Sequence, residues 1–349
     1  MNLSASAVPR LLFRADGNAQ IGLGHLMRLL ALANQLQGLA LGTFLVREPT
    51  AAVGQMLAAN GWIVQPLPAQ QSWLAEADWL AQQVLQPSDV LVLDGYYFGA
   101  DYQQRLRVSG CSLVYVDDLQ AWPVVADVLI NHSPGVMATD YQAPTTTDFL
   151  LGPAFSLLRQ PFLESAALPQ WPTAIESALV CFGGADPLRL TVRIIRALQA
   201  LPQLQRLGVL LGSAFGDAAA LEELAATSSG VIITFHRNIE AAPLANLLRE
   251  HDMAIVPAST VLIEALVLGR PSITGYYVDN QRALASYVHA HQQAFSVGNF
   301  AELNDAGLLA RLHDGIAWLE TTPRQPYVKQ LRPDLLRAKV QQLLDRALP

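Results

Sequence analysis

A histidine stands in a glycine-containing turn near the N-terminus. His25 follows Gly22 and Gly24 within residues 14–28, which link an apolar run to a helical pattern that begins at Leu26. Glycines let a backbone approach a ligand closely, and the first N–H groups of a helix attract phosphate. The positive end of the helix dipole also favours a neutral imidazole, the form that acts as a general base. We therefore expect Gly22, Gly24 and Arg28 to bind substrate and His25 to act on it.

The same turn has structural interpretations. A tight turn alone would explain Gly22 and Gly24, with His25 as an ordinary helix residue. Met27 stands where a dinucleotide-binding turn needs glycine or alanine for close packing of helix on strand, which disfavours NAD. Asp16 is the second candidate catalytic residue, because its carboxylate can orient the loop or assist the base. A local turn or cap is its alternative role.

Two loops in the C-terminal half also follow predicted strands and precede predicted helices. In the first loop, Gly183 and Gly184 are candidates for ligand contact, while Asp186 is predicted to cap the helix that follows. In the second loop, Ser259 and Thr260 open an apolar helix and are candidates for phosphate binding.

Three polar residues nearby could contact a sugar. Glu264 lies among apolar residues of the helix that begins near Ser259, so its carboxylate needs partners, which paired sugar hydroxyls can supply. A helix-dipole or capping-box role is the alternative. Asn280 and Gln281 follow a strand and either read sugar hydroxyls or N-acetyl groups or cap a helix.

The elements that must position these residues alternate between short β-type runs and helical patterns. This rhythm predicts an α/β protein with parallel sheets in two Rossmann-like domains, residues 1–163 and 177–349. A proline-punctuated linker occupies residues 163–176. The tail at 333–347 is amphipathic and is expected to pack back on a domain, with Leu335, Leu336, Val340, Leu343 and Leu344 on its apolar face. The predicted strands are 11–14, 43–46, 90–93, 112–116, 128–130, 178–182, 208–211, 231–235, 253–256 and 272–275.

Composition narrows the class of protein. The chain has 349 residues, of which 52% are hydrophobic and 15% charged, as suits two buried cores. Its apolar runs are far shorter than the roughly 20 residues that cross a bilayer. A formal charge of −7 offers no basic face for nucleic acid. The N-terminus lacks a signal-peptide pattern and the two cysteines suit buried thiols, so we expect a cytoplasmic protein without membrane association.

A metal site is not expected from the sequence. Asp117 and Asp118 follow a strand as an acidic pair, but no histidine or further acid is spaced to complete a coordination shell. Phosphate charge would then be carried by backbone N–H groups at helix N-termini. The sequence therefore predicts neither a metal nor a cofactor.

The order of these motifs resembles the UDP-2,4-diacetamido-2,4,6-trideoxy-β-L-altropyranose hydrolase family of pseudaminic acid biosynthesis. The resemblance rests on Arg-Ala-Asp followed by Ile-Gly-x-Gly-His-x-x-Arg within 14–28, on Phe-Gly-Gly-x-Asp-Pro at 182–187 and on Asp-Asn-Gln at 279–281. It spans most of the chain. The family is similar to GT-B glycosyltransferases, so the resemblance implies two facing Rossmann-like domains with a cleft between them.

The resemblance also implies roles for individual residues. His25 matches the histidine assigned to water activation, and Glu264 matches the ribose-binding glutamate. Ile239 lies where the backbone contacts uracil, and Asn280 and Gln281 lie where the sugar is read. The implied reaction is hydrolysis of a UDP-sugar to free sugar and UDP, with other enzymes of the nonulosonic acid pathway as candidate partners. The chain departs from the family at 258–259, where alanine and serine replace the usual glycine pair.

Two other functions use the same pocket. A glycosyltransferase would pass the sugar of a UDP-sugar donor to an alcohol in surface polysaccharide synthesis. The N-terminal half shows no apolar or basic cluster of the kind expected of an enzyme with a membrane acceptor. A nucleotide-sugar sensor would bind without turnover, which His25 in its glycine loop disfavours.

Overall fold

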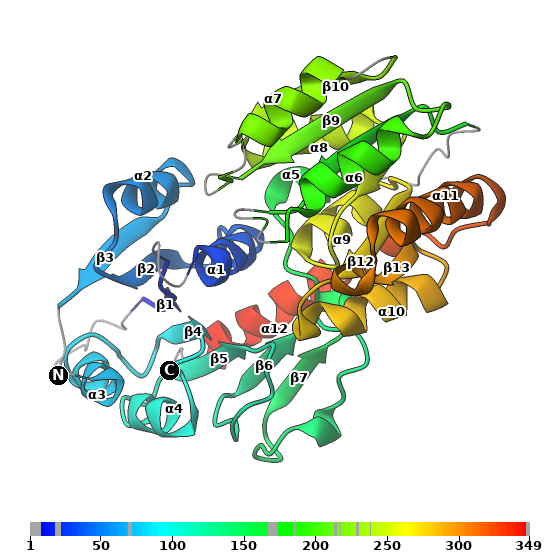
Figure 1. Ribbon diagram of the computed structural model, residues 1–349. Helices are drawn as coiled ribbons and strands as arrows, with labels where there is room; N and C mark the ends of the chain where they lie inside the picture. The colour runs from blue at the N-terminus through cyan, green and yellow to red at the C-terminus, as the bar shows by residue number, and fades with distance from the viewer. Residues whose placement is uncertain are drawn as a thin grey trace, which may run out of the picture. The chain divides into compact units, whose positions relative to one another are not determined.

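The protein consists of two α/β units, each built on one parallel sheet (Figure 1). Unit 1 comprises Met1–Arg159 and Leu331–Pro349, and unit 2 comprises Gln160–Gln330. The computed structural model describes residues 8–17, 22–68, 72–166, 174–183, 186, 188–212, 215–216, 218–227, 230–237 and 239–346.

Unit 1 contains a seven-stranded parallel sheet in the order β3-β2-β1-β4-β5-β6-β7. Its strands are β1 (Arg10–Arg14), β2 (Leu41–Arg47), β3 (Ile63–Leu67), β4 (Val90–Asp94), β5 (Ser112–Val116), β6 (Val128–Asn131) and β7 (Asp148–Leu151). From β1 the chain proceeds outward through β2 and β3, and then returns to build β4 to β7 on the other side. The strand order therefore reverses between β1 and β4, and ligands of open α/β sheets bind at the carboxyl ends beside such a reversal.

Helices cover both faces of this sheet. One face carries α1 (Gly24–Gln35), α2 (Ala51–Ala59) and α12 (Pro333–Arg346), and the other carries α3 (Trp73–Gln83) and α4 (Ala100–Arg107). Alternate strand residues supply the two cores, since Phe13 packs with the α1 side and Leu12 with the α3 and α4 side. Burial on both faces explains why the strands are almost continuously apolar.

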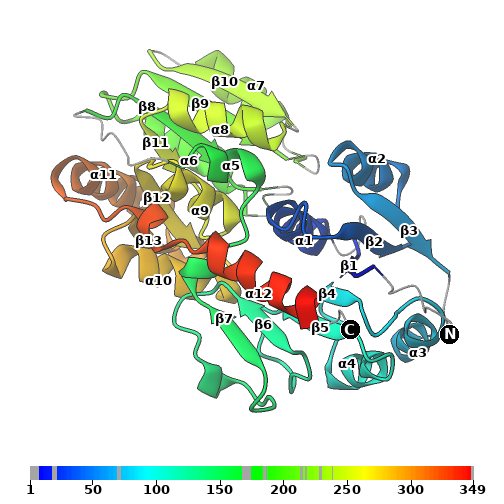
Figure 2. The ribbon, with the colours of Figure 1, turned by 180° about the vertical axis from the view of Figure 1, so that it is seen from behind.

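The C-terminal helix α12 belongs to unit 1, as both ribbon views show (Figures 1 and 2). Its residues Leu336, Val340, Leu343 and Leu344 join the core that contains β1 and α1. Unit 2 begins at Gln160 and ends at Gln330, so it starts within the expected N-terminal domain of residues 1–163 and ends before the tail of the expected C-terminal domain of residues 177–349. Leu335 was expected on the apolar face but is 51% exposed, because the face of the helix that packs on the core contains Leu336 instead.

Unit 2 contains a six-stranded parallel sheet in the order β10-β9-β8-β11-β12-β13, with a reversal between β8 and β11. Its strands are β8 (Ser177–Cys181), β9 (Arg206–Leu211), β10 (Ile232–Arg237), β11 (Met253–Ile255), β12 (Ser272–Tyr276) and β13 (Phe295–Asn299). Its helices are α5 (Gln160–Glu164), α6 (Leu190–Gln199), α7 (Ala218–Thr227), α8 (Ala241–Glu250), α9 (Thr260–Val267), α10 (Arg282–Ala290) and α11 (Asp305–Thr321). Within the described ranges of both units, no helix is long and apolar enough to span a membrane.

Candidate active site

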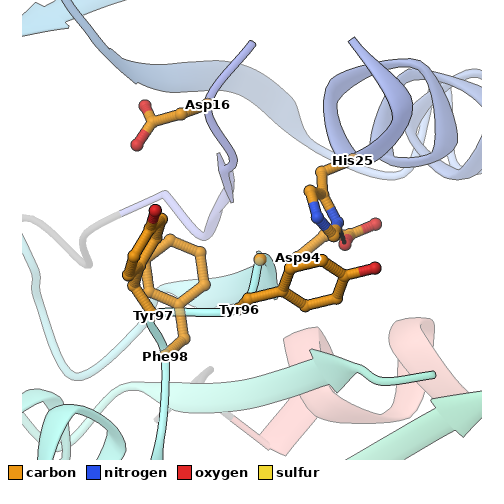
Figure 3. A pocket seen from close by; sticks show the side chains of 7 residues that line it. Asp16, His25, Asp94, Tyr96, Tyr97 and Phe98 are labelled. Carbon is orange, nitrogen blue, oxygen red and sulfur yellow. Dashed lines mark hydrogen bonds and ion pairs between the residues drawn. The ribbon is translucent and has the colours of Figure 1, made fainter. Parts of the chain in front are cut away.

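A cavity of about 240 Å³ opens where the strand order of unit 1 reverses (Figure 3). Asp16 follows β1, His25 lies in the first turn of α1, and Asp94 ends β4. Parallel strands present their carboxyl ends at one edge, so the fold gathers residues that are distant in the chain. The cavity is lined by Asp16, His25, Asp94, Gly95, Tyr96, Tyr97 and Phe98.

The imidazole of His25 is oriented by Asp94. Nδ1 of His25 lies 2.8 Å from Oδ1 of Asp94, and the ring of Tyr96 meets the imidazole edge-on with 4.3 Å between ring centroids. An ionised carboxylate can only accept a hydrogen bond, so Nδ1 carries the proton and donates it. Nε2 then keeps its lone pair, which is the arrangement of a general base held by a carboxylate.

Arg28 keeps Asp94 ionised within the protein. Its Nε donates to Oδ2 and its Nη2 to Oδ1, each at 2.7 Å. Burial alone would raise the pKa of Asp94, but attraction to Arg28 and the hydrogen bonds from Arg28 and His25 lower that pKa overall. Nη1 of Arg28 donates to Asp118 at 2.6 Å. The guanidinium expected to bind substrate is thus paired with two carboxylates.

Asp16 lies across the cavity from His25 and belongs to a separate network (Figure 3). Its oxygens accept from Nη1 and Nη2 of Arg14 at 2.5 and 2.8 Å, and the backbone N–H of Arg47 donates to Oδ1 at 2.8 Å. Arg14 is fully buried and also donates from Nε to Glu76 at 2.8 Å. The structure therefore holds Asp16 as a fixed carboxylate that faces the cavity, while Asp94 is the carboxylate that orients His25.

The two glycines that precede His25 differ in their backbone conformation. Gly22 has a φ of +77°, in the left-handed region that favours glycine. Gly24 begins α1, and the side chain of the N-cap residue Leu23 makes no capping hydrogen bond, so among the described residues the backbone N–H groups of this first turn are candidates for ligand contact. Residues 18–21 of the motif lie outside the described residues.

The two aspartates after β5 have different hydrogen-bond partners. Asp117 accepts backbone N–H groups of Leu119 and Gln120 at 3.3 and 2.9 Å and the hydroxyl of Tyr141 at 2.8 Å, so it shapes the loop. Asp118 instead accepts from Arg28. In the part of the chain that the structure describes, no three His, Cys, Asp or Glu residues form a group that could hold a metal ion.

In unit 2, the loop after β8 is closed by Asp186. Its Oδ1 accepts the backbone N–H of Leu190 and its Oδ2 that of Thr191, both at 2.8 Å. Asp186 therefore caps the start of α6 through its side chain, although the N-cap position itself is Arg189, and it occupies N–H groups that would otherwise face an anion. Gly183 precedes the cap with a φ of +80°, while Gly184 lies outside the described residues.

The start of α9 differs from the start of α6. Ser259 is the residue before the first turn, but its side chain makes no capping hydrogen bond, so N–H groups near Thr260 remain for an anion. This loop follows β11, beside the strand reversal of the second sheet. Glu264 lies further along α9 and is 1% exposed.

The remaining predicted residues of unit 2 follow other strands. Ile239 is half-buried and lies shortly after β10. Asn280 is exposed in the short 3-10 helix η3 (Asp279–Gln281), where Oε1 of Gln281 accepts the backbone N–H of Tyr277 at 3.2 Å. Ile239, Asn280 and Gln281 all follow the carboxyl ends of strands in the second sheet, and ligands of open α/β sheets bind at these ends.

Sequence reasoning missed Asp94 and the aromatic residues after it. The signal was present, because Asp94 ends a buried strand and Gly95 follows it at once. A Cβ on Gly95 would lie 2.8 Å from the ring of Phe98, so only glycine allows this close approach. Acidic residues that end a parallel strand beside a glycine are therefore candidates for this kind of site.

Comparison with solved structures shows the class of fold. The protein is similar to MurG of Acinetobacter baumannii, with a TM-score of 0.65, 15% identity and coverage of 97% of this chain and 99% of that one. It is also similar to UGT2 of Phytolacca americana, with a TM-score of 0.55, 13% identity and coverage of 97% and 94%. At these identities the likeness shows the fold alone, and it confirms the predicted GT-B-like class.

Comparison with curated sequences supports the resemblance found in the motifs. The chain is 24% identical over 286 residues to UDP-2,4-diacetamido-2,4,6-trideoxy-beta-L-altropyranose hydrolase of Campylobacter jejuni, covering 80% of this chain and 96% of that protein. It is 23% identical over 298 residues to the spore coat polysaccharide biosynthesis protein SpsG of Bacillus subtilis, covering 81% and 82%. No family model matches the chain.

Proposed function

We propose that the protein is an enzyme that hydrolyses a UDP-linked 2,4-diacetamido-2,4,6-trideoxy sugar to the free sugar and UDP. The observation that carries this proposal is the series of hydrogen bonds that links His25 to Asp94 and Asp94 to Arg28 beside a cavity of unit 1. The relative from Campylobacter jejuni is named as a hydrolase of such a UDP-sugar, which supports the choice of substrate.

In the proposed reaction, Nε2 of His25 removes a proton from a water molecule as the water oxygen attacks C1 of the sugar. The bond between C1 and the phosphate oxygen breaks, and UDP leaves with the bonding electrons. Asp94 keeps the proton on Nδ1 and stabilises the imidazolium that forms. Arg28 acts through Asp94, which it keeps ionised, rather than by contact with the sugar.

Asp16 is proposed to read the sugar from the opposite wall. Arg14 and the backbone of Arg47 fix its carboxylate, so it is ready to accept a hydrogen bond from a hydroxyl or an acetamido N–H group. This role replaces direct assistance of the base, because the carboxylate that accepts the hydrogen bond from His25 is Asp94.

Unit 2 is proposed to hold UDP. The uncapped start of α9 at Ser259 and Thr260 suits the diphosphate, because the start of α6 is already occupied by a carboxylate. Glu264 would accept the ribose hydroxyls, the backbone at Ile239 would contact uracil, and the η3 amides would contact the sugar. In unit 1, Gly22 and Gly24 would bring further N–H groups to the substrate.

Release of UDP in the absence of an acceptor tests this proposal. The protein is incubated with UDP-sugars that carry or lack acetamido groups, and UDP is quantified over time, with His25→Asn as the inactive control. We expect UDP and free sugar in equal amounts from an acetamido substrate. Release that occurs only after addition of an alcohol acceptor would instead indicate a glycosyltransferase, and no release under either condition would overturn the proposal.

A further inference from the structure

Exposed aromatic side chains of the described residues gather on two neighbouring loops of unit 1. Tyr96, Tyr97 and Trp122 are 41%, 48% and 37% exposed, and they are the aromatic members of the large apolar side chains that remain exposed there. Tyr96 and Tyr97 follow β4, whereas Trp122 follows β5, the strand that pairs with it. Neighbouring exposed aromatic side chains are a feature that binding surfaces share.

A second cavity of about 290 Å³ lies beside these rings and shares Tyr97 with the cavity of His25. Its volume is at the lower limit of the roughly 300–1,000 Å³ of small-molecule sites, so it suits one sugar ring rather than a whole nucleotide sugar. The cavity is lined by Leu74, Tyr97, Gly99, Ala100, Asp101, Tyr102 and Trp122.

The aromatic walls of this second cavity are held in place. Nε1 of Trp122 donates to the hydroxyl of Tyr115 at 3.3 Å. The ring of Tyr97 stacks on Trp73 with 4.3 Å between centroids and 10° between planes, and the Arg47 guanidinium lies 3.9 Å from the centroid of Trp73. Walls that are ordered before binding reduce the entropic cost of taking up a small ligand.

The polar group of the cavity is a carboxylate. Asp101 is exposed at the start of α4 and makes no ion pair within the described residues. The hydroxyl of Tyr102, in contrast, donates to Glu76 at 2.8 Å and is already used. A carboxylate accepts hydrogen bonds from hydroxyl groups and repels phosphate, which favours a neutral polyol over a nucleotide.

We propose that this cavity is a second sugar site, which binds a free pyranose ring beside the reaction cavity. The C–H groups of one sugar face would pack on Tyr97 and Trp122, while hydroxyl groups would donate to Asp101. Its shared wall with the His25 cavity suits retention of the sugar that hydrolysis releases. The inference goes beyond the proposed function, because binding here requires no turnover.

Titration with N-acetyl-D-glucosamine, followed by NMR of the tryptophan indole N–H groups, tests the site. The chain has six tryptophans, and the signal that Trp122→Phe removes identifies Trp122. We expect saturable shifts of the Trp122 and Trp73 signals, with the same dissociation constant in the presence of saturating UDP. No shift of either signal, or loss of the shifts on addition of UDP, would overturn the proposal.

Calorimetry with the same sugar then measures how much each side chain of the cavity contributes to affinity, by comparison of variants with the wild type. Trp122→Ala should weaken binding by about fivefold to tenfold, the range of one aromatic contact, whereas Trp122→Phe should remain within about twofold. Asp101→Asn, at an exposed position that folding tolerates, should weaken binding by roughly threefold to tenfold. Tyr96→Ala is the matched control, because Tyr96 lines only the His25 cavity.

Unchanged affinity in both Trp122→Ala and Asp101→Asn would refute the second site. A loss of affinity in Tyr96→Ala equal to that in Trp122→Ala would also refute it, because the sugar would then occupy the His25 cavity. These titrations contain no UDP-sugar, so their failure leaves the UDP-release assay unaffected and the two proposals are tested separately.

Discussion

Replacement of Asp94 by Asn tests whether Asp94 holds His25 in the tautomer that leaves Nε2 unprotonated. The amide keeps the shape of the carboxylate, but its NH₂ group can donate a hydrogen bond to Nδ1, whereas the carboxylate can only accept one. The imidazole would then carry its proton on Nε2. In that tautomer Nε2 cannot accept a proton from water, although the shape of the site is unchanged.

The expected effect on turnover is large. A positioned general base contributes roughly 10²- to 10⁴-fold, and the comparable substitution in a serine-protease triad costs about 10⁴-fold. We expect Asp94→Asn to lower kcat by about 10³-fold, equivalent to about 4 kcal/mol of barrier, with little change in KM.

The structure also sets the expected loss of stability. Asp94 is fully buried, and its Oδ1 faces both His25 and Nη2 of Arg28. An amide NH₂ group in place of Oδ1 loses the bond from Nη2, and the bond from Nε of Arg28 to the remaining oxygen is weakened because that oxygen is neutral. Arg28 retains Asp118, so the loss should be smaller than the roughly 3–5 kcal/mol of a fully broken buried ion pair. Chemical denaturation of the wild type and the variant measures this difference.

Steady-state UDP release gives kcat and KM for Asp94→Asn and for Asp118→Asn, the matched control. Asp118→Asn removes only the outer partner of Arg28, so its kcat should stay within about tenfold of the wild type. The double variant His25→Ala, Asp94→Asn should have the same kcat as His25→Ala alone, because both substitutions remove the same general base. A folded Asp94→Asn variant with near wild-type kcat would refute the assignment of the base.

Four further predictions follow from the structure. His25→Asn should lower kcat by roughly 10²-fold or more while calorimetry shows almost unchanged UDP affinity. EDTA should leave the initial rate intact, because backbone N–H groups are assigned to the phosphates; a loss that magnesium restores would contradict this. Glu264→Ala should weaken UDP binding by at least tenfold in calorimetry, since charge-assisted hydrogen bonds are worth about 1.5–3 kcal/mol each, and a deoxyribose nucleotide should lose less. Burial, with repulsion from Arg28, lowers the pKa of His132 from 6.5 to about 4, so the unfolded chain binds this proton at higher pH than the folded chain. Stability should therefore fall between pH 6.5 and 4, by up to roughly 3 kcal/mol from this group, and denaturation curves of His132→Gln should lack that part of the loss.

The sequence predicted the interior of both sheets better than their edges. All ten predicted strands are present, whereas β3, β7 and β13 were missed, and each of these is an edge strand. Interior strands are buried on both faces and therefore carry long apolar runs. Edge strands tolerate residues such as Pro66 in β3, because one row of their backbone groups needs no partner within the sheet.

The site was predictable only where its interactions are local. Asp186 and the N–H groups it caps lie within five residues, so a capping pattern in the sequence was enough. His25 and Asp94 are separated by 69 residues, and they meet because β1 pairs with β4. Nothing in the sequence around either residue specifies that pairing, so the partner of the histidine needed the structure.

The return of α12 to unit 1 has a consequence for the order in which the chain folds during synthesis. The core beneath α1 requires Leu336, Val340 and Leu344, which leave the ribosome after every residue of unit 2. Unit 2 is contiguous in sequence and can close as soon as its own strands are made, since domains generally fold as units. Until α12 arrives, apolar residues of unit 1 such as Leu11 lack part of the cluster that covers them. The unit that is translated first is therefore the last to be completed.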